Sequence, residues 1–134
     1  MIGVIVVAHF GLAEKFMEAA EKITGKKPEN IVAISINPGK DVNGINQEIM
    51  KAIKKVDGKD GILILTDMFG GTPCNMSLAF LKEGKVEVLT GLNLPMLIEV
   101  LDAKHDKKPL VDLAKHIQSL GQKNICLASE ILNK

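Results

Sequence analysis

The chain contains no arginine, and all 17 of its basic residues are lysines. A lysine ammonium lacks the planar fork with which arginine binds a phosphate through two parallel hydrogen bonds. A phosphate bound by this chain must therefore depend on backbone amides and hydroxyls. The formal net charge is only +1 and the charges are scattered, so the chain has no long basic stripe of the kind that binds nucleic acid. We expect no nucleic-acid partner.

Long apolar runs and paired cysteines are also missing. No stretch approaches the roughly 20 apolar residues that a membrane-spanning helix needs. The first apolar run, residues 2–8, is short and has no basic leader, so we expect a cytoplasmic protein. Cys74 and Cys126 form no CxxC motif, and we interpret them as small apolar residues in a reducing compartment. Zinc-ligand spacing is absent too, and we expect neither a metal nor another cofactor.

Short apolar runs alternate with segments of helical periodicity, over a length that suits a single domain at residues 1–134. The runs predict strands at residues 2–8, 31–36, 62–66, 86–89 and 125–128. Buried strands that alternate with amphipathic helices are typical of an α/β fold, with a doubly wound, mainly parallel sheet and helices on both faces. Right-handed crossovers then make the first and third strands neighbours, and a crevice opens beyond their carboxyl ends.

His9 and Asp67 follow the ends of these two strands. Neighbouring strands lie about 4.8 Å apart, so the two side chains can reach hydrogen-bond distance. An aspartate bound to one imidazole N–H fixes the tautomer and leaves the other ring nitrogen free to act as a nucleophile. The pair therefore predicts a site for phosphoryl transfer.

Gly70, Gly71 and Thr72 follow Asp67 closely and are candidates for binding the phosphate. Glycines let backbone amides approach an anion, and a helix that begins near Pro73 and runs to Gly84 would direct its positive dipole end at the site. Thr72 is the predicted N-cap of that helix. Together these groups could hold a phosphoryl group without a metal.

Each of these candidate site residues also has a simpler, structural interpretation. A histidine at a strand end is often structural, Asp67 could only cap its loop, and the two glycines could only supply a turn with positive φ. Their convergence at one predicted crevice favours the functional interpretation. Phe10 and Phe69 flank the site, where they could form a small apolar rim, shield a phosphohistidine or contribute to a docking surface.

The other histidines and glycine loops are weaker candidates. His105 lies in a polar stretch that predicts a solvated loop. His116 lies off the apolar face of its predicted helix and is expected to be exposed. The string NPGKDVNG does not have the spacing of a nucleotide-binding P-loop. We therefore expect no ATP site.

The strings MIGVIVVAH, TDMFGGTPCN and TGLNLPMLIEVL resemble, over essentially the whole chain, the enzyme IIA component of the mannose family of the phosphoenolpyruvate:sugar phosphotransferase system. The resemblance implies that the phosphocarrier HPr transfers a phosphoryl group to Nε2 of His9, and that this domain passes it to an enzyme IIB partner. Asp67 would hold the other ring nitrogen. Thr66, Gly70, Gly71 and Thr72 match the phosphate-binding loop of the family.

The resemblance also implies a homodimer in which an antiparallel last strand is contributed across the interface. The link to a membrane sugar permease would be indirect, and the length of the chain fits a free-standing IIA protein. One departure is Phe10, because the family usually has glycine immediately after the histidine.

Two other functions remain open from the sequence. The domain could accept phosphate as a signal and bind another protein in a regulatory role, or it could bind a phosphorylated metabolite without covalent chemistry. The sugar cannot be inferred, since its recognition would belong to the membrane partner.

Overall fold

The computed structural model describes residues 1–37, 39–102 and 108–132, and the predicted alternation of strands and helices is confirmed there. The predicted loop around His105 lies outside these ranges. The strands are β1 (Gly3–His9), β2 (Ile31–Ile36), β3 (Ile62–Thr66) and β4 (Val86–Leu89). The helices are α1 (Leu12–Thr24), α2 (Val42–Lys55), α3 (Thr72–Leu78), α4 (Leu94–Asp102), α5 (Leu110–Lys123) and α6 (Ala128–Leu132).

The strands form one parallel sheet in the order β2-β1-β3-β4. The predicted pairing of the first and third strands is therefore confirmed, with Val7 opposite Thr66 in the register. On its other side β1 pairs with β2, where His9 lies opposite Ile36. The carboxyl ends of β1 and β3 consequently meet at one edge of the sheet, next to the point where the chain reverses its direction of winding.

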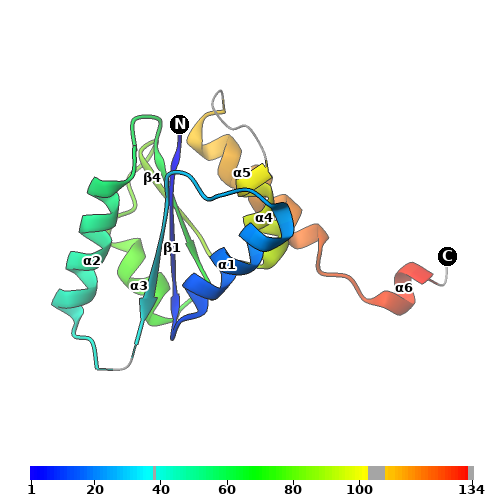
Figure 1. The fold of residues 1–134 in the computed structure, drawn as a ribbon, viewed down its shortest axis with the longest axis horizontal. Helices are drawn as coiled ribbons and strands as arrows, with labels where there is room; N and C mark the ends of the chain where they lie inside the picture. Colours follow the sequence, from blue (N-terminus) through cyan, green and yellow to red (C-terminus); the bar gives the residue numbers. More distant parts are fainter. Residues whose placement is uncertain (38, 103–107, 133–134) are drawn as a thin grey trace.

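Helices cover both faces of the sheet, as a doubly wound fold requires (Figure 1). Helices α1, α4 and α5 pack on one face, and α2 and α3 pack on the other. Strand β1 is buried from Val4 to Ala8 because alternate side chains enter the two cores. This double burial explains why β1 is continuously apolar in sequence.

Two predictions about α3 were wrong in detail. The N-cap is Gly71 and not Thr72, although Pro73 does lie in the first turn as expected. The helix also ends at Leu78 and does not continue to Gly84. Instead, Lys82 and Val86 form an antiparallel bridge that leads the chain into β4.

The predicted last strand at residues 125–128 is absent from this chain. Residues 125–127 have no regular structure and α6 begins at Ala128. Figure 1 shows this segment leading away from the sheet, so it has no strand edge with which to pair. Ile125 is 79% exposed and Leu127 is 64% exposed. Cys126 is free and exposed as well, whereas Cys74 is free and buried.

In the described parts of the chain, none of the helices combines the length and apolar character needed to cross a lipid bilayer.

Candidate functional site

His9 and Asp67 meet at the carboxyl edge of the sheet. His9 is the last residue of β1, and Asp67 directly follows β3. The Nδ1 atom of His9 lies 2.7 Å from Oδ2 of Asp67. The backbone N–H of His9 donates to the same oxygen at 3.0 Å. The predicted contact between the two side chains is thus present, and the register of two parallel strands produces it.

The Asp67 carboxylate is held from both of its oxygens. Oδ2 accepts the two bonds from His9, while Oδ1 accepts the backbone N–H of Met68 at 3.0 Å. An ionised carboxylate can only accept hydrogen bonds, so Nδ1 of His9 carries the proton. In the neutral ring, Nε2 then has the free lone pair. The Asp67 side chain is 10% exposed and the His9 side chain 30% exposed, so solvent reaches the histidine more readily.

The surroundings of Asp67 favour its charged form. Burial raises the pKa of this carboxyl, but hydrogen bonds from the His9 backbone and ring, together with the charge of a protonated His9, lower it. The net result is a pKa below the ordinary value of 3.8. Asp67 therefore stays ionised through the neutral range, as an acceptor for Nδ1–H must.

The lowered pKa of Asp67 predicts a specific acid sensitivity. A carboxylate with a lowered folded-state pKa contributes stability that is complete above its unfolded pKa and is lost as pH falls through the folded value. We expect the difference in unfolding free energy between the wild type and Asp67→Asn to shrink below about pH 4. Urea unfolding across this range measures it. A difference that persists unchanged at the acid end would contradict the prediction.

Gly71 packs directly against the edge of the His9 ring that carries Nε2. A Cβ atom built on Gly71 would lie 2.8 Å from Cε1 of His9 and 3.2 Å from Nε2. The φ angle of Gly71 is −80°, which any residue can adopt, so glycine is needed here for space and not for its conformational freedom. Gly70 differs, because its φ is +85° and no atom lies near its Cβ position.

The remaining predicted phosphate-binding residues lie in different surroundings. Thr72 is exposed in the first turn of α3, where backbone N–H groups have no intrahelical acceptor. Thr66 is fully buried, and within the described residues its hydroxyl oxygen has no hydrogen-bond partner. The Thr66 hydroxyl could contact a phosphate only after local rearrangement.

Two exposed aromatic side chains border the site. Phe10 is 62% exposed and Phe69 is 76% exposed, with Met68 at 53% beside them. Phe10 has a φ of +51°, which costs a residue other than glycine about 1 kcal/mol or more. Its ring centroid lies 6.1 Å from that of His9. Met68 was not predicted at this site, although its place directly after Asp67 in the sequence was a usable signal.

His116 is less exposed than its sequence pattern predicted. Its Nε2 atom lies 2.5 Å from Glu99, so the pair joins α5 to α4 away from His9. The chain therefore contains a second histidine bound to a carboxylate, which provides a natural control for His9.

Comparison with known proteins identifies the family. The family model EIIA-man, described as PTS system fructose IIA component, matches residues 3–118. The fructose-specific EIIA component of Bacillus subtilis (strain 168) is 30% identical over 135 residues, covering 100% of this chain and 91% of that protein. The mannose-specific EIIAB component of Escherichia coli (strain K12) is 28% identical over 125 residues, which span 92% of this chain and 38% of that longer protein.

The fold agrees with these sequence matches. The crystal structure of phosphotransferase system component EIIA from Streptococcus agalactiae has a TM-score of 0.85 and 30% identity, and covers 97% of this chain and 99% of that one. The chain therefore belongs to the EIIA-man family of enzyme IIA components, which are phosphoryl carriers of the sugar phosphotransferase system. The identification made from the sequence motifs is confirmed.

Proposed function

We propose that this chain accepts a phosphoryl group from HPr on Nε2 of His9 and passes it to an enzyme IIB partner in the cytoplasm. The observation that carries this proposal is the 2.7 Å contact between Nδ1 of His9 and Asp67. With the proton on Nδ1 as donor to Asp67, Nε2 keeps its lone pair, which supports its proposed role as the nucleophile. Family membership supports the same reaction.

The transfer is an in-line exchange between two imidazoles. The lone pair of Nε2 forms a new bond to phosphorus while the bond from phosphorus to the donor nitrogen breaks, and that electron pair returns to the donor ring. The His9 ring gains positive charge as its bond to phosphorus forms. The Asp67 carboxylate, bound to Nδ1–H, stabilises this charge. Alignment and fixed dipoles account for most of the rate in such transfers.

We assign the phosphoryl oxygens to backbone amides around Gly70, Gly71 and Thr72, with the Thr72 hydroxyl as a further donor. The position of Gly71 beside Nε2 supports this assignment, as does the lack of intrahelical acceptors in the first turn of α3. We propose that Thr66 joins this set when the carboxyl end of β3 rearranges, since its buried hydroxyl has a donor to offer. A site without arginine suits a carrier that must release its phosphate.

Phe10 and Phe69 are proposed as docking residues for HPr and enzyme IIB. Both rings are largely exposed. The Phe10 ring centroid lies 6.1 Å from that of His9, and Phe69 follows Asp67 by two residues in the sequence. Burial of exposed aromatic rings is a frequent source of binding energy at protein interfaces.

Gly71 provides a test of ring placement that does not alter the nucleophile. In Gly71→Ala the new methyl group would displace the His9 ring, so we expect phosphorylation to slow about a hundredfold with little change in fold stability. The control Gly84→Ala replaces another glycine of positive φ, +74°, whose Cβ position is open among the described residues, so it should cost about 1 kcal/mol of stability and leave the rate unchanged. Rates of phosphate incorporation and thermal unfolding measure the two effects. Equal rates in the two variants would contradict the proposed role of Gly71.

We also propose a homodimer in which residues 125–128 join the sheet of the partner as an antiparallel strand. The support is the exposure of Ile125 and Leu127, together with the position of β4 at the edge of the sheet. Light scattering should give twice the chain mass for the wild type. The double variant Ile125→Asp, Leu127→Asp should give the mass of one chain, whereas the exposed-site control Ser129→Asp should remain dimeric. A dimeric double variant would exclude this segment from the interface.

The experiment that tests the function is phosphorylation with purified components. Incubation with phosphoenolpyruvate, enzyme I and HPr should place acid-labile phosphate on the protein, and addition of enzyme IIB should remove it. A non-covalent binder of phosphorylated metabolites would acquire none. A phosphorylated protein that fails to transfer to any enzyme IIB would support the regulatory alternative.

A further inference from the structure

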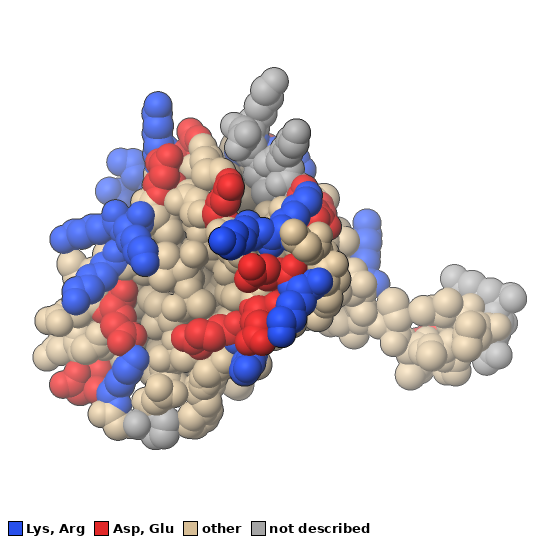
Figure 2. Space-filling model, viewed as in Figure 1, with Lys and Arg blue, Asp and Glu red and all other residues tan. Residues whose placement is uncertain are grey.

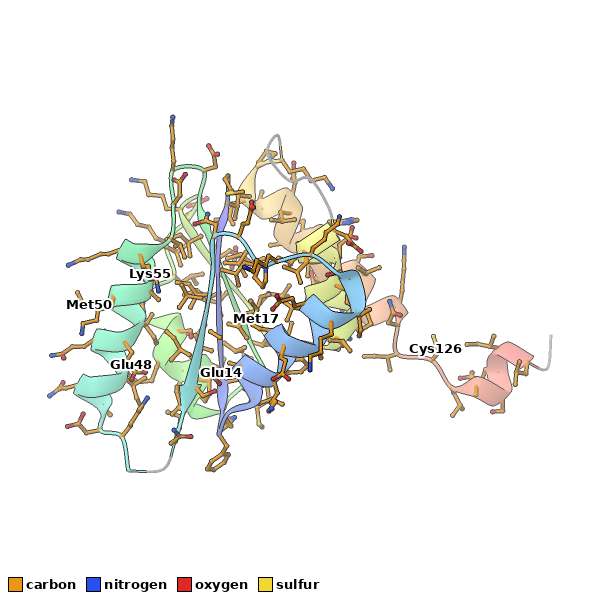
Figure 3. All side chains as sticks on the ribbon, viewed as in Figure 1. Glu14, Met17, Glu48, Met50, Lys55 and Cys126 are labelled. Carbon is orange, nitrogen blue, oxygen red and sulfur yellow. The ribbon has the colours of Figure 1, made fainter. Side chains whose placement is uncertain are left out.

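A shallow groove of about 290 Å³ lies along β2, away from His9. Its floor is the middle of this strand, residues 32–34. One wall is α2, with Glu48, Lys51 and Lys55, and the other is α1, with Glu14. Figure 3 shows Glu48 and Lys55 on α2 and Glu14 on α1, on opposite sides of β2.

Strand β2 offers unpaired backbone groups to this groove. Among the described residues it is an edge strand that pairs with β1 alone. The carbonyl groups of Asn30 and Ile36 accept the N–H groups of Val4 in β1 and of Phe10 directly after β1, at 3.0 Å each. Because backbone groups alternate in direction along a strand, those of Ile31, Ala33 and Ser35 point away from the sheet. The carbonyl of Ser35 accordingly accepts a bond from the side chain of Lys40 at 3.3 Å.

The charges of the two walls differ. On the α2 side, Lys40 pairs with Glu48 at 2.7 Å, but no ion pair among the described residues includes Lys51 or Lys55. On the α1 side, Glu14 already accepts a hydrogen bond from the Ser35 hydroxyl. Figure 2 shows lysines gathered over the upper part of α2 with acidic side chains below them, and acidic and basic side chains mixed over α1. The groove therefore has uncompensated positive charge on one wall only.

We propose that this groove binds an extended acidic segment of another protein, which adds a strand to β2. Its backbone would pair with the outward groups of Ile31 and Ala33, and alternate acidic side chains would face Lys51 and Lys55. Side chains between them would face α1. The site is separate from His9 and gives this chain a second protein contact beyond its phosphoryl partners.

A second copy of this chain fits the groove poorly. Two β2 edges paired around a two-fold axis would bring α2 of each copy together on the same face of the sheet. Lys51 and Lys55 would then approach their own counterparts, and like charges in such positions repel. Lysines do protect exposed strand edges from unwanted pairing. The acidic side chains of another protein would instead be attracted to Lys51 and Lys55.

The proposal can be tested with a blocked peptide of about seven residues in which glutamate alternates with valine. Two-dimensional NMR titration of the full chain should give saturable shifts with an alternating pattern. The outward amides of Ile31, Ala33 and Ser35 should shift most, and those of Val32 and Ile34 least. A matched peptide with lysine in place of glutamate should cause no saturable shift.

Two variants separate charge from strand pairing. The double variant Lys51→Glu, Lys55→Glu should weaken glutamate-peptide binding about tenfold and allow the lysine peptide to bind. The control Lys15→Glu, on a 77% exposed side chain of α1, should bind normally. Ala33→Pro removes an N–H that β1 does not use, so the fold should survive while peptide binding is lost.

Absence of saturable shifts at about 1 mM peptide would overturn the proposal and leave these lysines only a protective role at the edge. Shifts that map to β4, or that survive charge reversal, would overturn it as well. Amide spectra of each variant without peptide establish that the fold is intact.

Discussion

Replacement of His9 by alanine is expected to abolish phosphate incorporation from phosphoenolpyruvate, enzyme I and HPr. The substitution removes Nε2, the atom that would bond to phosphorus. His9 is the last residue of β1 and belongs to neither apolar core, and its backbone N–H still bonds Asp67 in the variant, so the protein should remain folded. Mass spectrometry of the reaction mixture measures the bound phosphate, and circular dichroism measures the fold.

His116 is the matched control for this experiment. It too has a ring nitrogen bound to a carboxylate, that of Glu99, and it is 40% exposed. His116→Ala should therefore incorporate phosphate at the wild-type level. Retained labelling of His9→Ala, or loss of labelling in His116→Ala, would mean that the nucleophile is misassigned.

Substitution of Asp67 by asparagine has the second largest expected effect. An amide can present either its oxygen or its NH₂ group to His9, but Oδ2 of Asp67 accepts from two donors while Oδ1 accepts from Met68. An NH₂ group in either position would therefore face an N–H donor. The His9 ring would lose its preferred tautomer and its stabilising charge, so we expect transfer to slow at least about a hundredfold.

The readout for Asp67→Asn is the rate of phosphate incorporation at saturating HPr, which separates chemistry from docking. Asp57→Asn is a suitable control, because Asp57 also accepts a backbone N–H, that of Lys59, but lies on the exposed surface. The control should transfer at the wild-type rate. An unchanged rate in Asp67→Asn would remove the carboxylate from the mechanism.

A comparison of the carboxyl ends of β1 and β3 with residues 125–128 explains where prediction from the sequence succeeded and where it failed. The apolar run of β1 and the run of β3 each end in a polar residue, and the rules of parallel sheets bring such ends together. The pairing of His9 with Asp67 could thus be predicted from pattern alone, and the structure gives the expected contact. The segment at residues 125–128 has an equally apolar pattern, yet it forms no strand within this chain.

The outcome at residues 125–128 follows from how strands are stabilised. A strand needs hydrogen bonds to a neighbour, and sequence pattern records only the tendency to be buried. Helix boundaries present a similar difficulty. Residue preference allows either Thr72 or Gly71 as the N-cap. The packing of Gly71 against His9 joins residues far apart in the chain, so a local preference cannot predict it.

By itself, the sequence determined the alternation of strands and helices, the family and the residues available for chemistry. The local pattern of apolar and polar residues is enough to indicate burial and backbone preference. Only the tertiary structure decided which ring nitrogen of His9 is free, that Thr66 is buried and that the edge of β2 is open between two charged walls. These features depend on contacts between residues far apart in the chain. The distances between such residues are set by the folded structure, and a local sequence pattern does not give them.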